Sequence, residues 1–151
     1  MALNSVSQGR FRPKHQSKYA GNSKNIVFRS SWERTFMQYC DENSRVLKWA
    51  SEEMHIPYFF VPDGKWHRYF PDFVMVVQTN QGQETWIVEI KPHKQTLPPT
   101  GRGRRAIKEA VEYGRNQSKW TAADAYCRKR GWKFRVITEK TLYPQAPRKQ
   151  R

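Results

Sequence analysis

The sequence predicts an α/β domain whose elements follow the order helix, three strands, helix, strand. Two apolar runs rich in β-branched and aromatic residues, 69–77 and 84–91, flank a polar linker that contains glycine, which is typical of a β-hairpin. Ser30 and Glu33 form the capping-box pattern that opens a helix near Ser31. At 151 residues, the chain is long enough for one domain with a real core.

The other elements are predicted from apolar periodicity and turn signals. The strands are expected at 56–61, 66–77, 85–91 and 133–138, and residues 46–50 either pack under the first helix or form a short strand. Pro57 places the first of these strands at an edge or at a strand start. The second helix begins at Arg104, is interrupted or bent at 114–118 and ends at Gly131. Its predicted buried face comprises Ala106, Ile107, Ala110, Val111 and Tyr113 or Gly114.

Composition divides the chain into three parts. Residues 1–25 are basic, contain no acid and are rich in Ser, Asn, Gln and Gly, so they predict an arm poorly suited to a core. Within this arm, Phe11 and Tyr19 are expected to pack back onto the domain rather than stack on bases. Residues 26–142 form the predicted domain, and residues 143–151 form a basic tail that is either disordered or an extension that binds a partner.

The charge balance indicates a polyanion as the partner. There are 28 Lys and Arg against 13 Asp and Glu, a formal net charge of +15, which is the electrostatic footprint of a nucleic-acid binder. A generic basic surface or a ribosomal-type RNA binder is the alternative. The chain lacks a signal-peptide pattern and has no apolar run near the roughly 20 residues of a membrane span, so we expect a soluble intracellular protein that does not bind a membrane. Cys40 and Cys127 stand alone, outside any zinc spacing, and predict buried free thiols.

Three charged residues inside the predicted hairpin mark the candidate site. Strand alternation places Glu89 and Lys91 on one face of the sheet. If the register also brings Asp72 to that face, two carboxylates and an ammonium meet there, a set suited to metal and phosphate chemistry. Each piece alone is explained as well by a solvated face or a cross-strand ion pair. Glu33 is already explained by its helix-capping position.

These residue types match the needs of phosphodiester hydrolysis. Asp72 and Glu89 are hard oxygen donors suited to Mg²⁺ or Mn²⁺, and the backbone carbonyl of Ile90 is a further candidate ligand. A bound divalent ion would acidify water and stabilise the charge that develops on the phosphate. Lys91 would orient or deprotonate the attacking water, or stabilise the transition state as an ammonium, and the sequence does not decide between these roles. Glu33 would act through a water or a second ion.

The order Glu33, Pro71-Asp72, Glu89-Ile90-Lys91 resembles the PD-(D/E)xK nuclease superfamily. This resemblance implies a restriction-endonuclease-like core, with a mixed central sheet of about four strands flanked by helices. Over about residues 8–142 the chain also resembles the head completion nucleases of T-even-like tailed phages and, more distantly, the endonuclease subunit of heteromeric transposases. The resemblance to the phage family is carried by Arg29–Glu33, Trp49–Glu53, Ile56–Tyr58, Tyr69–Phe73, Glu89–Pro92 and Lys119–Trp120.

The phage family implies a Mg²⁺-dependent DNA endonuclease, with Mn²⁺ as the alternative cofactor, that trims or prepares the packaged DNA end before the neck and tail join the head. The expected partners are double-stranded DNA and phage portal or neck proteins, in the host cytoplasm during assembly or at the head–neck region of the virion. Two alternatives stay open. One is a structure-specific or junction-resolving endonuclease of recombination or repair, a class that usually acts as a homodimer, and the other is a non-catalytic DNA-binding head-closure protein on a nuclease scaffold.

Basic and polar residues around these motifs are the candidate DNA contacts, because affinity for DNA comes largely from phosphate contacts. For Gln117 and Lys119, a solvated helix face is an equally good explanation. The predicted DNA-binding residues are Arg10, Arg12, Lys14, Lys18, Arg29, Lys94, Arg102, Arg104, Arg105, Gln117 and Lys119.

Overall fold

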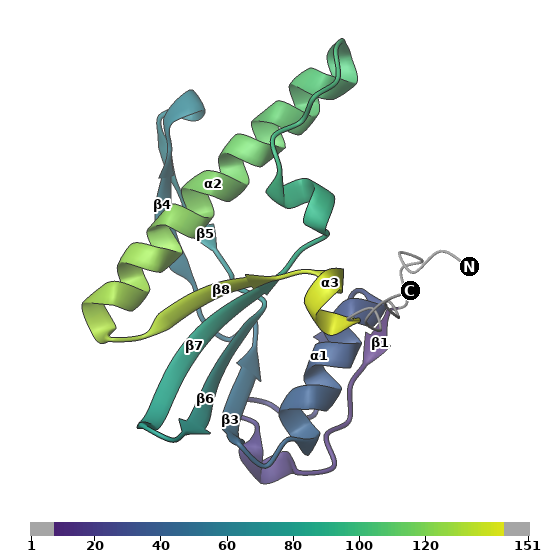
Figure 1. The fold of residues 1–151 in the computed structure, drawn as a ribbon, viewed down its shortest axis with the longest axis vertical. Helices are drawn as coiled ribbons and strands as arrows, with labels where there is room; N and C mark the ends of the chain where they lie inside the picture. Colours follow the sequence, from purple (N-terminus) through teal and green to yellow (C-terminus); the bar gives the residue numbers. More distant parts are fainter. Residues whose placement is uncertain (1–7, 144–151) are drawn as a thin grey trace, which may run out of the picture.

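The computed structural model describes residues 8–143, which are organised around a four-stranded sheet (Figure 1). Neighbouring strands are antiparallel except for β7 and β8, which are parallel, so the sheet is mixed. The predicted α/β architecture, a mixed sheet of about four strands flanked by helices, is therefore confirmed. The predicted tail lies outside the described residues from position 144 onward. The strand order is β3 (Val46–Ser51), β6 (Phe73–Thr79), β7 (Gly82–Ile90) and β8 (Lys133–Ile137).

The predicted central hairpin is present as β6 and β7. Its register runs from Phe73 opposite Val88 to Thr79 opposite Gly82. Alternation separates the two faces of β7, because Val88 joins one hydrophobic cluster and Ile87 joins the other. The sheet is thus covered on both faces, which explains why these strands are rich in β-branched residues.

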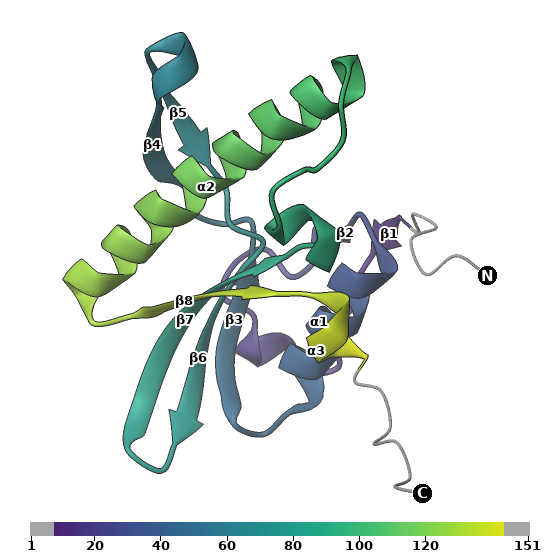
Figure 2. The same ribbon diagram turned by 45° about the horizontal axis from the view of Figure 1, so that its top comes forward.

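Two helices cover the two faces of the sheet (Figure 2). Helix α1 (Ser31–Glu42) packs Phe36, Met37 and Cys40 into the cluster that contains Trp49 of β3 and Phe73 of β6. The side chain of Ser30 accepts the Glu33 N–H at 3.2 Å, so the predicted helix start with Ser30 as N-cap is confirmed. The Glu33 carboxylate accepts the N–H of Arg29, one residue before the N-cap. Helix α2 (Arg104–Arg130) covers the other face with Ala123 and Cys127, against Ile87.

A second hairpin lies outside the central sheet and corrects the predicted strand order. Strands β4 (Ile56–Phe60) and β5 (Lys65–Tyr69) pair only with each other among the described residues, joined by the 3₁₀ turn η2 (Val61–Asp63). The predicted strand 56–61 is therefore not part of the central sheet, whose edge strands are β3 and β8. The predicted strand 66–77 is two strands, because Pro71, which has no N–H to donate to a ladder, lies between β5 and β6.

Helix α2 differs from its prediction in two ways. It is continuous through 114–118, since a single interior glycine costs a helix only about 1 kcal/mol. Its predicted apolar face is also exposed over the first turns, where Ile107 is 66% and Val111 46% accessible. The reason is visible in Figure 1, in which the N-terminal half of α2 extends beyond the sheet and the body of the domain. The helix ends at Gly131, in the left-handed conformation (φ 72°), as predicted.

The N-terminal stretch contributes to the core instead of standing apart from it. Phe11 and Tyr19 are buried against Trp49, with ring centroids 5.8 and 4.7 Å away, so the expectation that they pack back onto the domain is confirmed. Short strands β1 (Gly9–Arg10) and β2 (Val27–Phe28) pair beside α1, and η1 (Gln16–Lys18) lies between them in the chain. Residues 1–7 of the predicted arm lie outside the described residues.

The remaining short elements close the chain around the sheet. The segment between β7 and α2 contains the 3₁₀ turn η3 (His93–Thr96). The backbone N–H of His93 donates to the carboxylate of Glu139, in α3 (Glu139–Leu142), at 2.7 Å. Cys40 and Cys127 are buried free thiols, as predicted. Over residues 8–143, no helix is both long enough and apolar enough to cross a membrane.

Candidate active site

The register of β6 and β7 brings Asp72 to Glu89. Since Phe73 is opposite Val88, the preceding residue, Asp72, lies at the level of Glu89. The Ile90 N–H donates to Asp72 Oδ2 at 2.7 Å, and the Asp72 N–H donates to Glu89 Oε1 at 3.4 Å. Each carboxylate is therefore oriented by the backbone of the strand that carries the other, and the condition set by the sequence, Asp72 on the face of Glu89, is met.

The paired carboxylates are electrostatically unfavourable without a cation. Glu89 is only 5% exposed. Burial and the negative charge of Glu89 raise the pKa of Asp72 well above its ordinary value, against the opposing effects of the Ile90 N–H and Lys91. A divalent cation would remove this repulsion, and a set of hard carboxylate oxygens is what Mg²⁺ and Mn²⁺ prefer. The donor chemistry of this pair therefore fits the predicted metal.

Lys91 supplies a positive charge at the edge of this pair. Its N–H donates to the Ile137 carbonyl at 2.9 Å, which continues the pairing of β7 with β8 and fixes the backbone. Its Nζ lies 3.9 Å from Glu89 Oε2, and its side chain is 25% exposed. The ammonium is therefore next to the buried Glu89 carboxylate and is partly exposed to solvent.

Glu33 lies in the first turn of α1, where its carboxylate is held by neighbouring residues. Its carboxylate accepts the Arg29 N–H at 3.4 Å and the Ser30 hydroxyl at 3.4 Å. Burial, with a contribution from the charge of Glu52, raises the pKa of Glu33, and the Arg29 N–H opposes this shift. The negative charge of Glu33 also contributes to the raised pKa of Asp72. Capping and a place at the site are thus compatible.

Glu52 was not predicted as a site residue, yet it connects several parts of the site. It has a left-handed backbone (φ 53°), a conformation that costs a non-glycine residue about 1–3 kcal/mol. Its N–H donates to the Asp72 carbonyl at 3.2 Å, and its carboxylate pairs with the Arg29 guanidinium. The Trp49–Glu53 motif contains Glu52, but no residue pattern signals a left-handed glutamate.

Tyr69 and Lys119 complete the face of the site that α2 covers. Tyr69 is 3% exposed, and its hydroxyl has no hydrogen-bond partner of ordinary geometry within residues 8–143. Burial and the nearby charge of Glu89 raise its pKa. Lys119 Nζ lies 5.8 Å from the centre of the Tyr69 ring, and burial together with Lys91 lowers the pKa of Lys119, which Glu89 partly opposes. The structure therefore places Lys119 beside Tyr69, where the charge of Glu89 acts on its ammonium, whereas from the sequence a solvated helix face was an equally good explanation.

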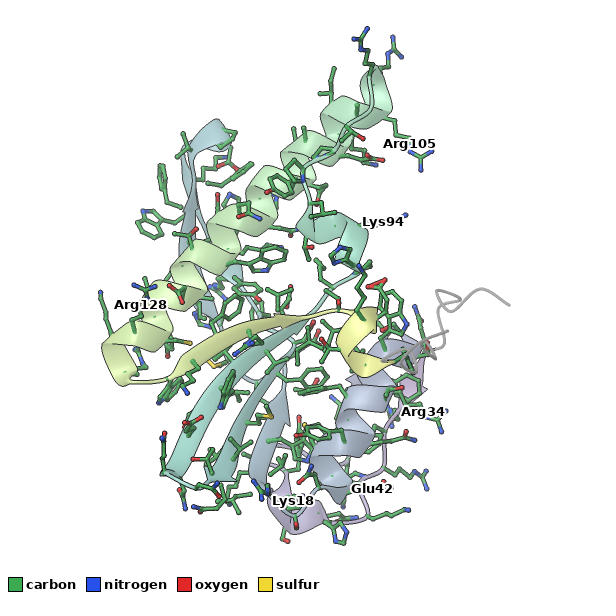
Figure 3. All side chains as sticks on the ribbon, viewed as in Figure 1. Lys18, Arg34, Glu42, Lys94, Arg105 and Arg128 are labelled. Carbon is green, nitrogen blue, oxygen red and sulfur yellow. The ribbon has the colours of Figure 1, made fainter. Side chains whose placement is uncertain are left out.

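The other predicted DNA contacts fall into different surroundings. Lys18 donates from Nζ to the carbonyls of Asp41 and Asn43, both at 2.9 Å, and so caps the end of α1, beside which it lies in Figure 3. Lys14 pairs with Glu42 at 3.3 Å. These two lysines have structural partners that compete with phosphate. Exposed side chains, oriented toward solvent, are Arg10, Arg12, Lys94, Arg102, Arg104 and Arg105.

Three of the exposed cations, Arg102, Arg104 and Arg105, lie at the beginning of α2. Figure 3 shows Lys94 and Arg105 projecting on the side of the molecule where α2 extends beyond the sheet. Arg105 also pairs with Glu109 at 3.2 Å, an exposed interaction worth only a few tenths of a kcal/mol. Gln117, by contrast, lines a separate groove beside β4 and is not grouped with the carboxylates.

Comparison with known proteins identifies the family. The family described as TnsA-like endonuclease N terminal matches residues 43–139, well over half of the chain. The chain belongs to this TnsA-like family. It is also 41% identical over 141 residues to the head completion nuclease of Enterobacteria phage T4, an alignment that covers 89% of this chain and 92% of that protein. Both resemblances drawn from the sequence, to the phage head completion nucleases and to the transposase endonuclease subunit, are therefore confirmed.

The TnsA-like match spans the part of the fold that carries the carboxylate pair. It includes β3, β6, β7 and β8, together with Asp72, Glu89 and Lys91, and it begins after Glu33. The fold of a TnsA-like domain is the restriction-endonuclease-like fold that the sequence predicted.

Proposed function

We propose that the chain is a divalent-metal-dependent DNA endonuclease that acts in phage head completion, where it trims or prepares the packaged DNA end before the neck and tail attach. The observation that carries the proposal is the buried pair of Asp72 and Glu89, oriented by strand backbone and bordered by the Lys91 ammonium. The setting in phage assembly comes from the name of the T4 relative. Phage portal or neck proteins are the proposed protein partners, because the proposed step comes before the neck and tail attach.

Each residue of the site has its own proposed role in catalysis. Asp72 and Glu89 would hold Mg²⁺ or Mn²⁺ with the Ile90 carbonyl, and Glu33 would act through a water or a second ion. When bound, the cation supplies Lewis-acid chemistry, lowering the pKa of water and neutralising charge on the phosphate. Lys91, 3.9 Å from Glu89, would orient or deprotonate the attacking water or stabilise the transition-state charge.

Double-stranded DNA is the proposed substrate, and cations around the site would position its backbone. Arg29 is held by Glu52 next to Glu33, and Lys119 reaches the site from α2. Arg102, Arg104 and Arg105 would extend the phosphate track along the part of α2 beyond the sheet. Such contacts set affinity and register without reading sequence.

The first expected result is metal-dependent cleavage of plasmid DNA. Purified protein should convert supercoiled plasmid into nicked or linear forms with Mg²⁺ or Mn²⁺ and leave it intact in EDTA, because the carboxylate pair requires a cation to act on a phosphodiester. Gel electrophoresis measures the conversion. Linear and branched DNA tested in parallel separate an end-trimming enzyme from a junction-resolving one. If all three substrates stay uncut with both metals, the chain is a non-catalytic DNA-binding protein on a nuclease scaffold.

The second expected result is that Mg²⁺ stabilises the fold. A ligand present at about 100 times its Kd adds about 2.7 kcal/mol to the free energy of unfolding, and this raises Tm by several degrees in a domain of this size. The comparison is a thermal melt in EDTA against one in Mg²⁺. Asp72→Asn should lose most of the shift, because it removes one of the two buried carboxylates. An equal shift in this variant would place the metal elsewhere.

A further inference from the structure

The outward face of the β4–β5 hairpin exposes two large aromatic side chains. Phe59 and Trp66 are direct cross-strand partners, with ring centroids 5.5 Å apart in an edge-on arrangement. They are 42% and 70% exposed, whereas the opposite face of the hairpin, with Tyr58 and Tyr69, is buried against α2. Aromatic residues of this size are seldom left on the surface of a monomer as a contiguous pair without a ligand.

These aromatics border a groove between β4 and α2. The groove encloses about 910 Å³, and its α2 wall includes Thr121, Tyr126, Lys129 and Arg130. The Arg130 guanidinium lies over the Tyr126 ring at 3.4 Å, which presents a flat cationic surface. The lining contains these two cations and no carboxylate.

Two of the charges next to the aromatic pair have no acidic partner among the residues that the structure describes. Lys129 makes no ion pair within residues 8–143, and neither does Arg68, which follows Trp66 by two positions and therefore lies on the same face of β5. Exposed aromatic rings flanked by unpaired cations are complementary to a single nucleic-acid strand, in which bases are joined by phosphates. Successive bases stack on the rings, and the cations follow the backbone.

We propose that this groove, together with the outward face of the β4–β5 hairpin, binds single-stranded DNA by stacking bases on Trp66 and Phe59. Duplex DNA cannot use these rings, because its bases are stacked inside the helix. The inference rests on the proposed nuclease function and deepens it: the substrate carries a single-stranded segment, such as an overhang or a displaced strand, next to the duplex that enters the carboxylate site. The groove and Lys119 share helix α2, since Gln117 and Ser118 line the groove.

The test is the binding of a fluorescently labelled oligothymidylate to the full-length chain, measured by anisotropy in EDTA, with a duplex of the same length in parallel. Trp66→Ala and Phe59→Ala should each weaken oligothymidylate binding by about fivefold or more, the loss expected for one stacked base, while duplex affinity changes less than twofold. Trp66→Phe, which keeps an aromatic ring, should recover much of the loss.

Val61→Ala is the matched control, because Val61 is a 77% exposed apolar residue at the tip of the same hairpin and outside the groove. It should bind like the wild type. The inference is overturned if Trp66→Ala binds oligothymidylate as Val61→Ala does, the result expected of a face that docks a protein, or if Trp66→Phe, which restores the ring, binds no better than Trp66→Ala. It is also overturned if oligothymidylate and duplex affinities fall equally.

Binding in EDTA keeps this test separate from catalysis. If the wild type cuts plasmid and the Trp66→Ala variant binds oligothymidylate normally, the stacking groove alone is overturned. If the Trp66→Ala variant selectively loses oligothymidylate binding and the wild type cuts no plasmid, the result supports the groove. It then counts against the nuclease function alone.

Discussion

Asp72→Asn is expected to reduce plasmid cleavage by about 10³-fold or more, because a missing metal ligand removes several kcal/mol of transition-state stabilisation. The amide keeps the shape of the side chain and an oxygen that can accept the Ile90 N–H, so the strand pairing at the site should persist. Binding to duplex DNA should stay within about threefold of the wild type, because affinity comes mainly from distributed phosphate contacts. Initial rates of nicking and anisotropy of a labelled duplex measure the two effects.

The stability of the same variant distinguishes a lost ligand from a damaged fold. The pKa of Asp72 is raised above its ordinary value of 3.8, so the folded state holds this proton more tightly than the unfolded state. The free energy of unfolding of the metal-free wild type should therefore decline as pH rises above about 3.8. Asp72→Asn has no carboxyl group that titrates at this position. In EDTA, its free energy of unfolding should therefore exceed that of the wild type as the pH rises. A variant that melts below the wild type at neutral pH would contradict this electrostatic account.

Asp124→Asn is the control for both measurements. Asp124 is a half-exposed aspartate of α2 that pairs with Arg128 at 2.9 Å and is not part of the proposed site. Cleavage by this variant should match the wild type. Equal loss of cleavage in Asp72→Asn and Asp124→Asn would show that the strand carboxylates are not the catalytic centre.

Lys91→Met should reduce cleavage by about 10²-fold or more, the range spanned by the loss of a proton-transfer group or of one electrostatic contact to the transition state. Methionine keeps most of the aliphatic stem and removes the charge that lies 3.9 Å from Glu89. Single-turnover cleavage at saturating protein isolates the chemical step from binding. Lys48→Met, at an exposed lysine of β3, is the control and should cleave as the wild type does.

Lys91→Arg separates two roles proposed for Lys91, proton transfer and electrostatic stabilisation of the transition state. Arginine stays protonated at every pH of the assay, so it can supply positive charge and cannot accept a proton. Activity well above that of Lys91→Met would favour electrostatic stabilisation, and equal inactivity would favour proton transfer or a strict geometric need for the ammonium. Cleavage by Lys91→Met at the wild-type rate would exclude both roles.

The parts of the fold that were predicted correctly are those that depend on local sequence patterns. The capping box at Ser30, the β6–β7 hairpin and the end of α2 at Gly131 each depend on a few neighbouring residues, and the sequence shows those residues directly. The approach of Asp72 to Glu89 could also be anticipated, because alternation and a short linker limit the registers that a hairpin can take.

Features that depend on distant contacts were not visible in the sequence. The apolar positions of α2 around Ile107 have helical spacing, but nothing local reveals that the sheet ends before it reaches them. The basic composition of residues 8–25 predicted an arm poorly suited to a core, and only the packing of Phe11 and Tyr19 onto the domain was anticipated. Because both side chains are buried, deletion of residues 1–25 would damage the fold, and Arg10 or Arg12 substitutions are the better test of DNA contacts there.

The position of the β4–β5 hairpin in the chain has a consequence for how this family can vary. Ser51 pairs with Phe73, and the Glu52 N–H reaches the Asp72 carbonyl, so the two ends of segment 52–72 meet. A short turn would suffice to connect β3 to β6, which makes the hairpin a topological insertion. Its length and surface can therefore change between relatives without shifting the register of the central sheet. The left-handed Glu52 is the point where the chain leaves the sheet. Asp72 is the point where it returns, so the proposed metal ligand lies where an exchangeable module closes.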